Sequence, residues 1–147
     1  MVVGYLADTA VRPLPCLLST EPASWRALVE KTRRTESALR VYAGFPVDDL
    51  RRELALAGPA FETVFDPTGA GDPTGPSGSA VLHVGFPERD GLRSLRLRYR
   101  TDVLSAECAA RIAGYHLTAL AQIVADPDAE HRRQRLLSAD ETRFQLH

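Results

Sequence analysis

The sequence predicts an α+β fold, an α/β sandwich in which helices cover a mixed sheet. Segments with apolar residues three and four positions apart, which is the helical period, flank segments that alternate apolar and polar residues. The expected order is one strand, two helices, three strands and two helices. A chain of 147 residues that is 44% hydrophobic and 25% charged can bury one core, so we expect a single domain over 1–147.

The first expected element is a buried strand from Val2 to about Val11, close to the N-terminus. Pro13 and Pro15 punctuate the apolar residues that follow, which predicts an irregular exit from the strand. The chain then changes to the helical period, so the strand leads directly into a long helix.

Two helices are expected between residues 20 and 56. Ser19 or Thr20 can N-cap the first, and Gly44 followed by Pro46 ends it. A short second helix runs over 46–56. The first helix carries an apolar stripe made of Trp25, Leu28, Thr32, Leu39 and Tyr42.

A strand is expected over 60–65, and residues 66–79 are predicted to form a flexible loop. This loop contains Asp-Pro-Thr-Gly twice and is rich in Gly, Pro and Ser. It contains neither G-x-G-x-x-G nor G-K-[ST], so it is not predicted to bind phosphate.

The segment 80–100 predicts a β-hairpin, because Asp90-Gly91 favours a tight turn between two alternating segments. That turn sets the register and places the apolar residues on one face. The predicted cross-strand pairs are Phe86 with Leu95, Val84 with Leu97, and Leu82 with Tyr99.

A second long helix is expected from Ser105 to about Ala125, where Asp126-Pro127 ends it. Residues 126–147 form a polar tail with a short helical segment near Ser138. The inner stripe of the long helix is predicted to contain Ile112, His116, Ala119, Leu120 and Ile123.

Motifs for catalysis or cofactor binding are lacking in the sequence. The four histidines occur outside H-E-x-x-H and H-H-x-x-x-D-G, and there is no G-x-S-x-G elbow. We therefore expect no catalytic residue, no metal and no cofactor. Cys16 and Cys108 are read as reduced thiols, which indicates the cytoplasm. A net charge of −1 and the absence of a long apolar run indicate that neither nucleic acid nor membrane is a partner.

Six segments, taken in order, resemble one known family. Residues 3–9 are similar to its (I/V)G-x-F-V-N-T strand, 42–50 to H-Q-D-x-P-F-E-x-L and 58–61 to N-P-L-F. Residues 99–104 are similar to Y-x-T-D-L-F, His116 to Pro127 to its last helix, and 136–143 to L-L-S-x-x-E-R. The family is the condensation domain of non-ribosomal peptide synthetases. The resemblance implies a truncated C-terminal lobe, half of a chloramphenicol-acetyltransferase-like fold, without the H-H-x-x-x-D-G motif of the other lobe.

The resemblance implies an interaction role rather than catalysis. The chain would be a non-catalytic scaffold module for an adenylation domain or a carrier protein, and its apolar faces would need a partner or a homodimer. The other face of the predicted hairpin carries His83 opposite Arg98, flanked by Arg96 and Arg100. This face could meet an acidic carrier protein or its phosphopantetheine; alternatively, it is solvated or is covered by a missing partner. The candidate interface residues are Asp8, Tyr42, Phe45, Pro46, His83, Arg96, Arg98 and Arg100.

Three alternatives stay open at this point. The chain could be the C-terminal half of a split condensation enzyme that forms amide bonds together with an N-terminal half. It could instead be an autonomous small α+β enzyme or binding domain, or a piece of a longer synthetase. The sequence does not distinguish these alternatives, because each is compatible with one foldable domain that lacks the histidine motif.

Overall fold

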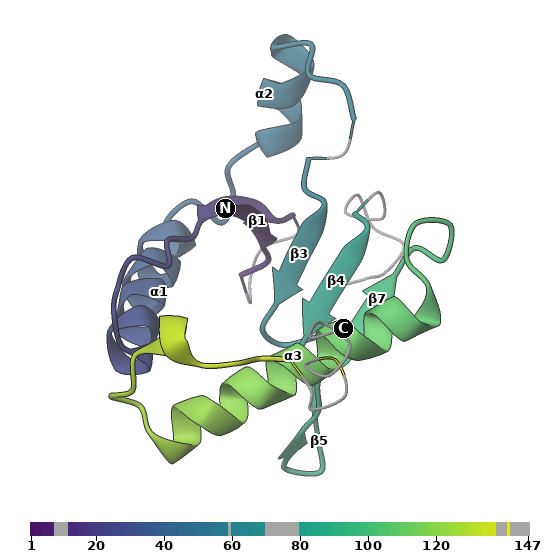
Figure 1. The fold of residues 1–147 in the computed structure, drawn as a ribbon. Coiled ribbons are helices and arrows are strands. Elements are labelled where there is room, and N and C mark those ends of the chain that lie inside the picture. Colours follow the sequence, from purple (N-terminus) through teal and green to yellow (C-terminus); the bar gives the residue numbers. More distant parts are fainter. Residues whose placement is uncertain (8–11, 59, 70–79, 138–140, 142–147) are drawn as a thin grey trace.

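The chain folds around a five-stranded mixed sheet with helices beside it (Figure 1), so the predicted α+β class is confirmed. The computed structural model describes residues 1–7, 12–58, 60–69, 80–137 and 141. Within these residues there are three α-helices, α1 (Trp25–Arg40), α2 (Val47–Glu53) and α3 (Ala106–Ala125). The strand order in the sheet is β2-β1-β3-β4-β7. The strands are β1 (Val2–Tyr5), β2 (Leu14–Leu17), β3 (Thr63–Asp66), β4 (Leu82–Gly85), β5 (Glu88–Arg89), β6 (Leu92–Arg93) and β7 (Arg96–Tyr99).

The predicted first strand is too long at its C-terminal end, and the irregular exit predicted after it is wrong. β1 ends at Tyr5, and residues 14–17 form β2, which pairs antiparallel with β1. Pro13 and Pro15 pointed away from a strand because proline removes a ladder hydrogen bond. β2 lies at the edge of the sheet, where proline is tolerated, so Pro15 lies opposite Gly4.

The predicted hairpin and its register are confirmed. β4 pairs antiparallel with β7, with Leu82 opposite Tyr99 and Val84 opposite Leu97. The small ribbon β5–β6 continues the hairpin beyond the sheet and keeps the same register. Asp90 and Gly91 have φ values of 54° and 76°, and a turn with two positive φ angles is the one that Asp-Gly favours.

The helices begin and end by local capping chemistry. α1 is capped by Ser24, whose Oγ accepts a hydrogen bond from the Ala27 amide at 3.2 Å, so the predicted cap at Ser19 or Thr20 is wrong. α1 also ends at Arg40, four residues before Gly44, and the backbone turns through residues 41–44. α3 is capped by Ser105 as predicted, because the Ser105 Oγ accepts from the Cys108 amide.

The core lies mainly within the sheet. Its central cluster contains Val3, Tyr5, Ala7 and Cys16, and Leu39 of α1 packs against it. The helices take little part, since α1 and α3 fully bury only Trp25 and Ala109, respectively. A helix that covers a core normally buries an apolar stripe, so these two helices leave apolar surface uncovered.

The loop predicted over 66–79 begins with a tight turn. The buried carboxylate of Asp66 accepts hydrogen bonds from the amides of Thr68 and Gly69, at 3.1 and 2.9 Å. Gly69 has a φ of 64° and lies against Pro87, so a side chain there would clash. Residues 70–79, and most of the short helical segment predicted near Ser138, lie outside the described residues. Among the described helices, none is long and apolar enough to span a membrane.

Candidate interaction surfaces

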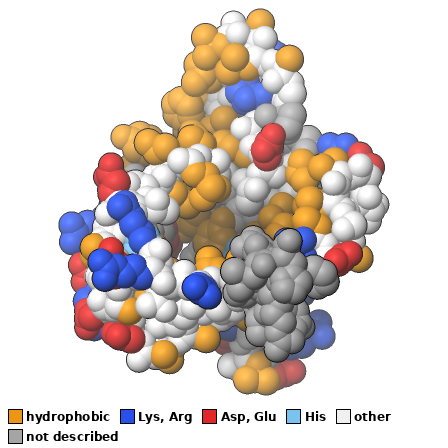
Figure 2. All heavy atoms as spheres, in the orientation of Figure 1, with side chains coloured by type: hydrophobic (Ala, Val, Ile, Leu, Met, Phe, Trp, Pro, Cys, Tyr) orange, Lys and Arg blue, Asp and Glu red, His pale blue; other side chains and the backbone are white. Residues whose placement is uncertain are grey.

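The first candidate surface is the segment of residues 41–58, which we call the arm. It contains α2 and stands away from the sheet (Figure 1). α2 fully buries only Val47, and hydrophobic side chains gather along the arm (Figure 2). Six large apolar residues of the arm are between 42% and 79% exposed: Val41, Tyr42, Phe45, Leu50, Leu54 and Leu56.

A groove of about 410 Å³ lies at the base of the arm. It is lined by residues 43–46, by Arg12, and by Asp48 and Asp49, and an ion pair joins Arg12 to Asp48. Phe45 and Pro46, both predicted interface residues, therefore line one groove, and Tyr42 belongs to the same exposed segment. Asp8, the remaining candidate near the N-terminus, lies outside the described residues.

The second candidate surface is the face of β4 and β7 that carries His83 and the arginines. Tyr5, Phe65 and Val84 are neighbours in the ladders, so they share one face, and the Tyr5 hydroxyl contacts Glu36 of α1. His83 lies opposite Arg98 as predicted, and alternation puts both on the other face of the sheet.

The arginines on this face have contacts within the chain. Arg96 Nη1 donates to the Gly69 carbonyl at 3.5 Å. Arg100 forms a two-pronged ion pair with Asp102, with N–O distances of 3.0 and 2.5 Å. The hydrogen bonds from Arg100 lower the pKa of Asp102. Part of the positive charge that was predicted to contact an acidic carrier protein is therefore neutralised by Asp102 of the same chain.

A third surface, not predicted from the sequence, is a groove of about 440 Å³ between α1 and α3, which we call the interhelical groove. Its α1 wall includes Trp25, Leu28 and Val29, and Ile123 contributes from α3. The molecule is hollowed at the centre of Figure 2, and hydrophobic side chains form the floor of the hollow. The walls are mainly apolar, so the groove suits an apolar segment of another protein better than a charged ligand.

The predicted inner stripes are partly wrong at this groove. Leu120 of α3 was expected to face the core but is exposed, as are Leu117 and Val124 on the same helix. Thr32 is also exposed, and its hydroxyl donates to the Leu28 carbonyl of its own helix. Tyr42 falls beyond the end of α1 and so cannot extend its stripe. The apolar spacing was read correctly, but α1 and α3 do not pack closely enough on each other to bury it.

The beginning of α1 is completed by residues 126–132, which we call the clasp. The first amides of a helix have no partner within the helix. The Trp25 amide donates to the Ala129 carbonyl at 3.2 Å, and the Arg26 amide donates to the Pro127 carbonyl at 2.7 Å. The Arg26 guanidinium also pairs with Asp128 at 2.7 Å and lowers the pKa of that carboxyl.

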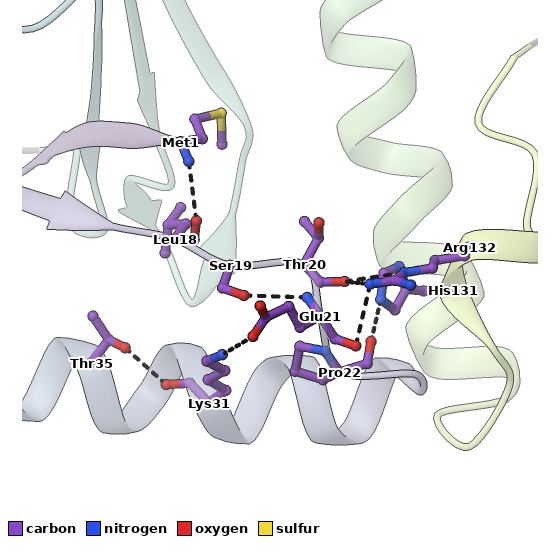
Figure 3. Close-up of polar contacts among 10 residues, drawn as sticks. All are labelled: Met1, Leu18, Ser19, Thr20, Glu21, Pro22, Lys31, Thr35, His131 and Arg132. Atoms are coloured by element: carbon purple, nitrogen blue, oxygen red, sulfur yellow. Dashed lines mark hydrogen bonds and ion pairs between the residues drawn. The ribbon is translucent and has the colours of Figure 1, made fainter.

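Two further side chains of the clasp hold the segment that precedes α1 (Figure 3). The ring nitrogen Nε2 of His131 donates to the Pro22 carbonyl at 2.5 Å, and the Arg132 guanidinium donates to the Thr20 carbonyl at 2.9 Å. The His131 ring also lies 5.4 Å from the Trp25 ring, centroid to centroid. The first part of the predicted polar tail is thus fixed to the beginning of α1, next to Trp25, which lines the interhelical groove.

A partly buried polar contact joins the sheet to α1. The Tyr5 hydroxyl donates to Glu36 Oε1 at 2.6 Å, and Arg40 Nη2 donates to the same oxygen at 2.8 Å. Burial first, and then Glu36, raises the pKa of Tyr5, whereas the Tyr5 hydroxyl and Arg40 lower the pKa of Glu36. Burial also raises the pKa of the Cys16 thiol, which makes it a poor nucleophile at neutral pH.

His116 and His131, two side chains that could carry chemistry, have structural contacts within the chain. Over residues 1–7, 12–58, 60–69, 80–137 and 141, no three His, Cys, Asp or Glu side chains meet in a geometry that could bind a metal ion. His116 donates from Nδ1 to the Ile112 carbonyl of its own helix at 2.8 Å, and His131 belongs to the clasp. No family model matches the chain, and no curated protein matches it.

Proposed function

We propose that the chain is an interaction module without catalytic activity of its own, which binds another protein through the interhelical groove. The observation that carries the proposal is that α1 and α3, with 16 and 20 residues, each fully bury a single residue. Helices of this length normally owe their stability to an apolar face packed against a partner. The uncovered apolar surface beside Trp25 and Ile123 therefore calls for another chain.

The partner class comes from the family resemblance. We propose a truncated C-terminal lobe of a condensation domain, with half of a chloramphenicol-acetyltransferase-like fold, that acts in the cytoplasm in non-ribosomal peptide biosynthesis. Its partner would be an adenylation domain or a carrier protein. The α+β class and the mixed sheet are compatible with this proposal. The ion pair of Arg100 with Asp102 neutralises part of the positive charge on this face, which favours an apolar contact over an acidic carrier surface.

The test is a calorimetric binding titration of the full chain against an adenylation domain and a carrier protein of a non-ribosomal peptide synthetase. Val29→Glu places a charge in the groove and is expected to abolish binding. Val103→Glu is the matched control, because Val103 is similarly exposed, at 53% against 46%, and lies outside the groove. Equal binding by both variants, or no binding by the unmodified chain, would contradict the proposal.

The split-enzyme alternative uses the same uncovered surface but predicts a different outcome. It requires an N-terminal half that carries H-H-x-x-x-D-G, and mixing the two halves should form amide bonds on carrier-bound substrates. Amide formation with the mixture would establish this alternative. Binding without amide formation would support the scaffold role.

A further inference from the structure

The interhelical groove has an apolar part and a polar part. Its apolar lining residues lie near the beginning of α1 and on α3: Trp25, Leu28, Val29 and Ile123. Its polar lining residues lie farther along α1: Thr32, Arg33 and Glu36. At 1.5 Å per residue, the α1 wall from Trp25 to Glu36 is about 16 Å long, or about three turns of helix. A partner segment that lies along this wall would therefore meet apolar side chains first and polar side chains at its other end.

The polar part of the groove offers one free group to a partner, the guanidinium of Arg33. The Thr32 hydroxyl donates to a carbonyl of its own helix at 2.9 Å. Glu36 accepts hydrogen bonds from Tyr5 and Arg40. Arg33 is exposed and has no hydrogen bond or ion pair with any residue that the structure describes. The other two polar residues of the wall are thus satisfied within the chain, and Arg33 is not.

The charges of α1 set Arg33 apart in the same way. The helix carries five cationic side chains, and four of them form ion pairs with carboxylates of this chain. The pairs are Arg26 with Asp128, Lys31 with Glu21 (Figure 3), Arg34 with Glu30 and Arg40 with Glu36. Arg33 is the fifth, and it is the one described cation in the wall of the groove. A guanidinium donates two parallel hydrogen bonds to a carboxylate, so the complementary group on a partner is Asp or Glu.

The walls of the groove favour a helix as the occupant. Both walls are helices, whose backbone hydrogen bonds are made within each helix, so they offer few backbone partners to a bound segment. An extended segment would leave its own amides and carbonyls unpaired against apolar side chains, which is costly. A helix satisfies these groups itself and presents apolar residues three and four positions apart, the spacing that the α1 wall also has.

We propose that the interhelical groove binds a single amphipathic helix of the partner protein, with an Asp or Glu at the end that lies beside Arg33. The apolar residues of that helix cover Trp25, Val29 and Ile123, and its carboxylate pairs with the Arg33 guanidinium. The inference rests on the proposed function, since it names the chemistry of the partner that the groove takes. The apolar contact supplies most of the affinity, and the ion pair at the rim selects the partner.

The test uses two synthetic helical peptides, each cross-linked to hold the helix and about 14 residues long, or about four turns. They share the same apolar residues at helical spacing, and one has Glu at both ends where the other has Gln. Binding to the full chain is followed by fluorescence anisotropy. We expect the Glu peptide to bind about twofold to fivefold more tightly at low ionic strength, the range of an exposed ion pair. This preference should become smaller at high salt.

Two variants of the chain separate Arg33 from the general positive charge of α1. Arg33→Gln should remove the preference for the Glu peptide and leave the affinity for the Gln peptide unchanged. Arg34→Gln is the matched control, because Arg34 is the exposed neighbour of Arg33 but lies outside the groove lining and is paired with Glu30. This variant should keep the preference.

Three results would overturn the inference. If both peptides bind equally and Val29→Glu abolishes binding of both, the carboxylate is not selected, while the groove proposal stands. If Val29→Glu leaves peptide binding unchanged, the peptides bind elsewhere on the chain. If neither peptide binds, the groove does not take a helix of this kind, and the titration against the synthetase domains still decides the proposed function.

Discussion

Replacing Tyr5 by Phe removes a single hydroxyl from the contact that joins the sheet to α1. Tyr5 is 4% exposed, and its hydroxyl donates to Glu36 at 2.6 Å. The phenylalanine ring fills the same space, so the packing against Phe65 is retained. Glu36 also keeps its hydrogen bond from Arg40. The variant therefore reports on one charge-assisted hydrogen bond between β1 and α1.

The expected loss follows from the charge and exposure of the partners. A hydrogen bond to a charged group contributes about 1.5–3 kcal/mol to the free energy of unfolding. The Glu36 side chain is 31% exposed and keeps one partner, which places the expected loss near the lower end, at about 1–2 kcal/mol. For a domain of this size, that loss lowers Tm by roughly 3–6 °C.

The loss should depend on pH. The Tyr5 hydroxyl is the main cause of the lowered pKa of Glu36, so in Tyr5→Phe that pKa returns toward its ordinary value. In the unmodified chain, the unfolded state takes up this proton first as the pH falls below about 5, and the folded state loses stability. The variant loses less stability over the same pH range, so the difference in the free energy of unfolding between the two chains becomes smaller in acid. The raised pKa of Tyr5 acts at the alkaline end of the pH scale. Its contribution to the free energy of unfolding is lost only as the pH rises past about 10.

The assay is urea unfolding followed by circular dichroism at several pH values between neutral and mildly acidic. Tyr42→Phe is the matched control, because it removes a hydroxyl from an exposed residue and should change the free energy of unfolding by less than about 0.5 kcal/mol. The reasoning is refuted if the two variants are equally stable at neutral pH. It is also refuted if the cost of Tyr5→Phe stays constant as the pH is lowered.

Three further predictions follow from the packing and the caps. Gly4→Ala would place a Cβ 2.7 Å from the Phe61 ring and should lower the free energy of unfolding by about 1–3 kcal/mol, as measured by urea unfolding. Gly44→Ala is the control, because its Cβ would meet nothing within 4 Å and the change should be neutral. Ser105→Ala removes the N-cap of α3 and should cost about 1 kcal/mol, and Ser105→Thr should retain most of the stability. His131→Ala opens the clasp beside Trp25, the sole tryptophan, so its fluorescence should shift to the red; an unchanged spectrum would contradict that contact.

Local chemistry explains which parts of the fold the sequence could predict. Asp90-Gly91 allowed the hairpin to be predicted, because few other pairs of residues adopt a positive φ at both positions. Ser105 decided the start of α3 for a similarly local reason. β2 was missed because Pro15 within it is tolerated only at an edge, and edge position depends on the whole sheet. The spacing of Trp25 and Leu28 predicted an apolar stripe but could not give the distance between α1 and α3.

The clasp could not be predicted because its contacts join residues about one hundred positions apart in the chain. Its bonds are mainly to backbone carbonyls, for which side-chain sequence carries no signal. The clasp nevertheless bears on the candidate site. The Trp25 amide donates a hydrogen bond to the clasp, and the Trp25 side chain lines the interhelical groove. Opening the clasp with His131→Ala should therefore weaken partner binding as well as shift the fluorescence. Arg133→Ala changes an exposed neighbour of His131 and should do neither. If His131→Ala shifted the spectrum and left binding unchanged, the groove beside Trp25 would not be the surface that the partner uses.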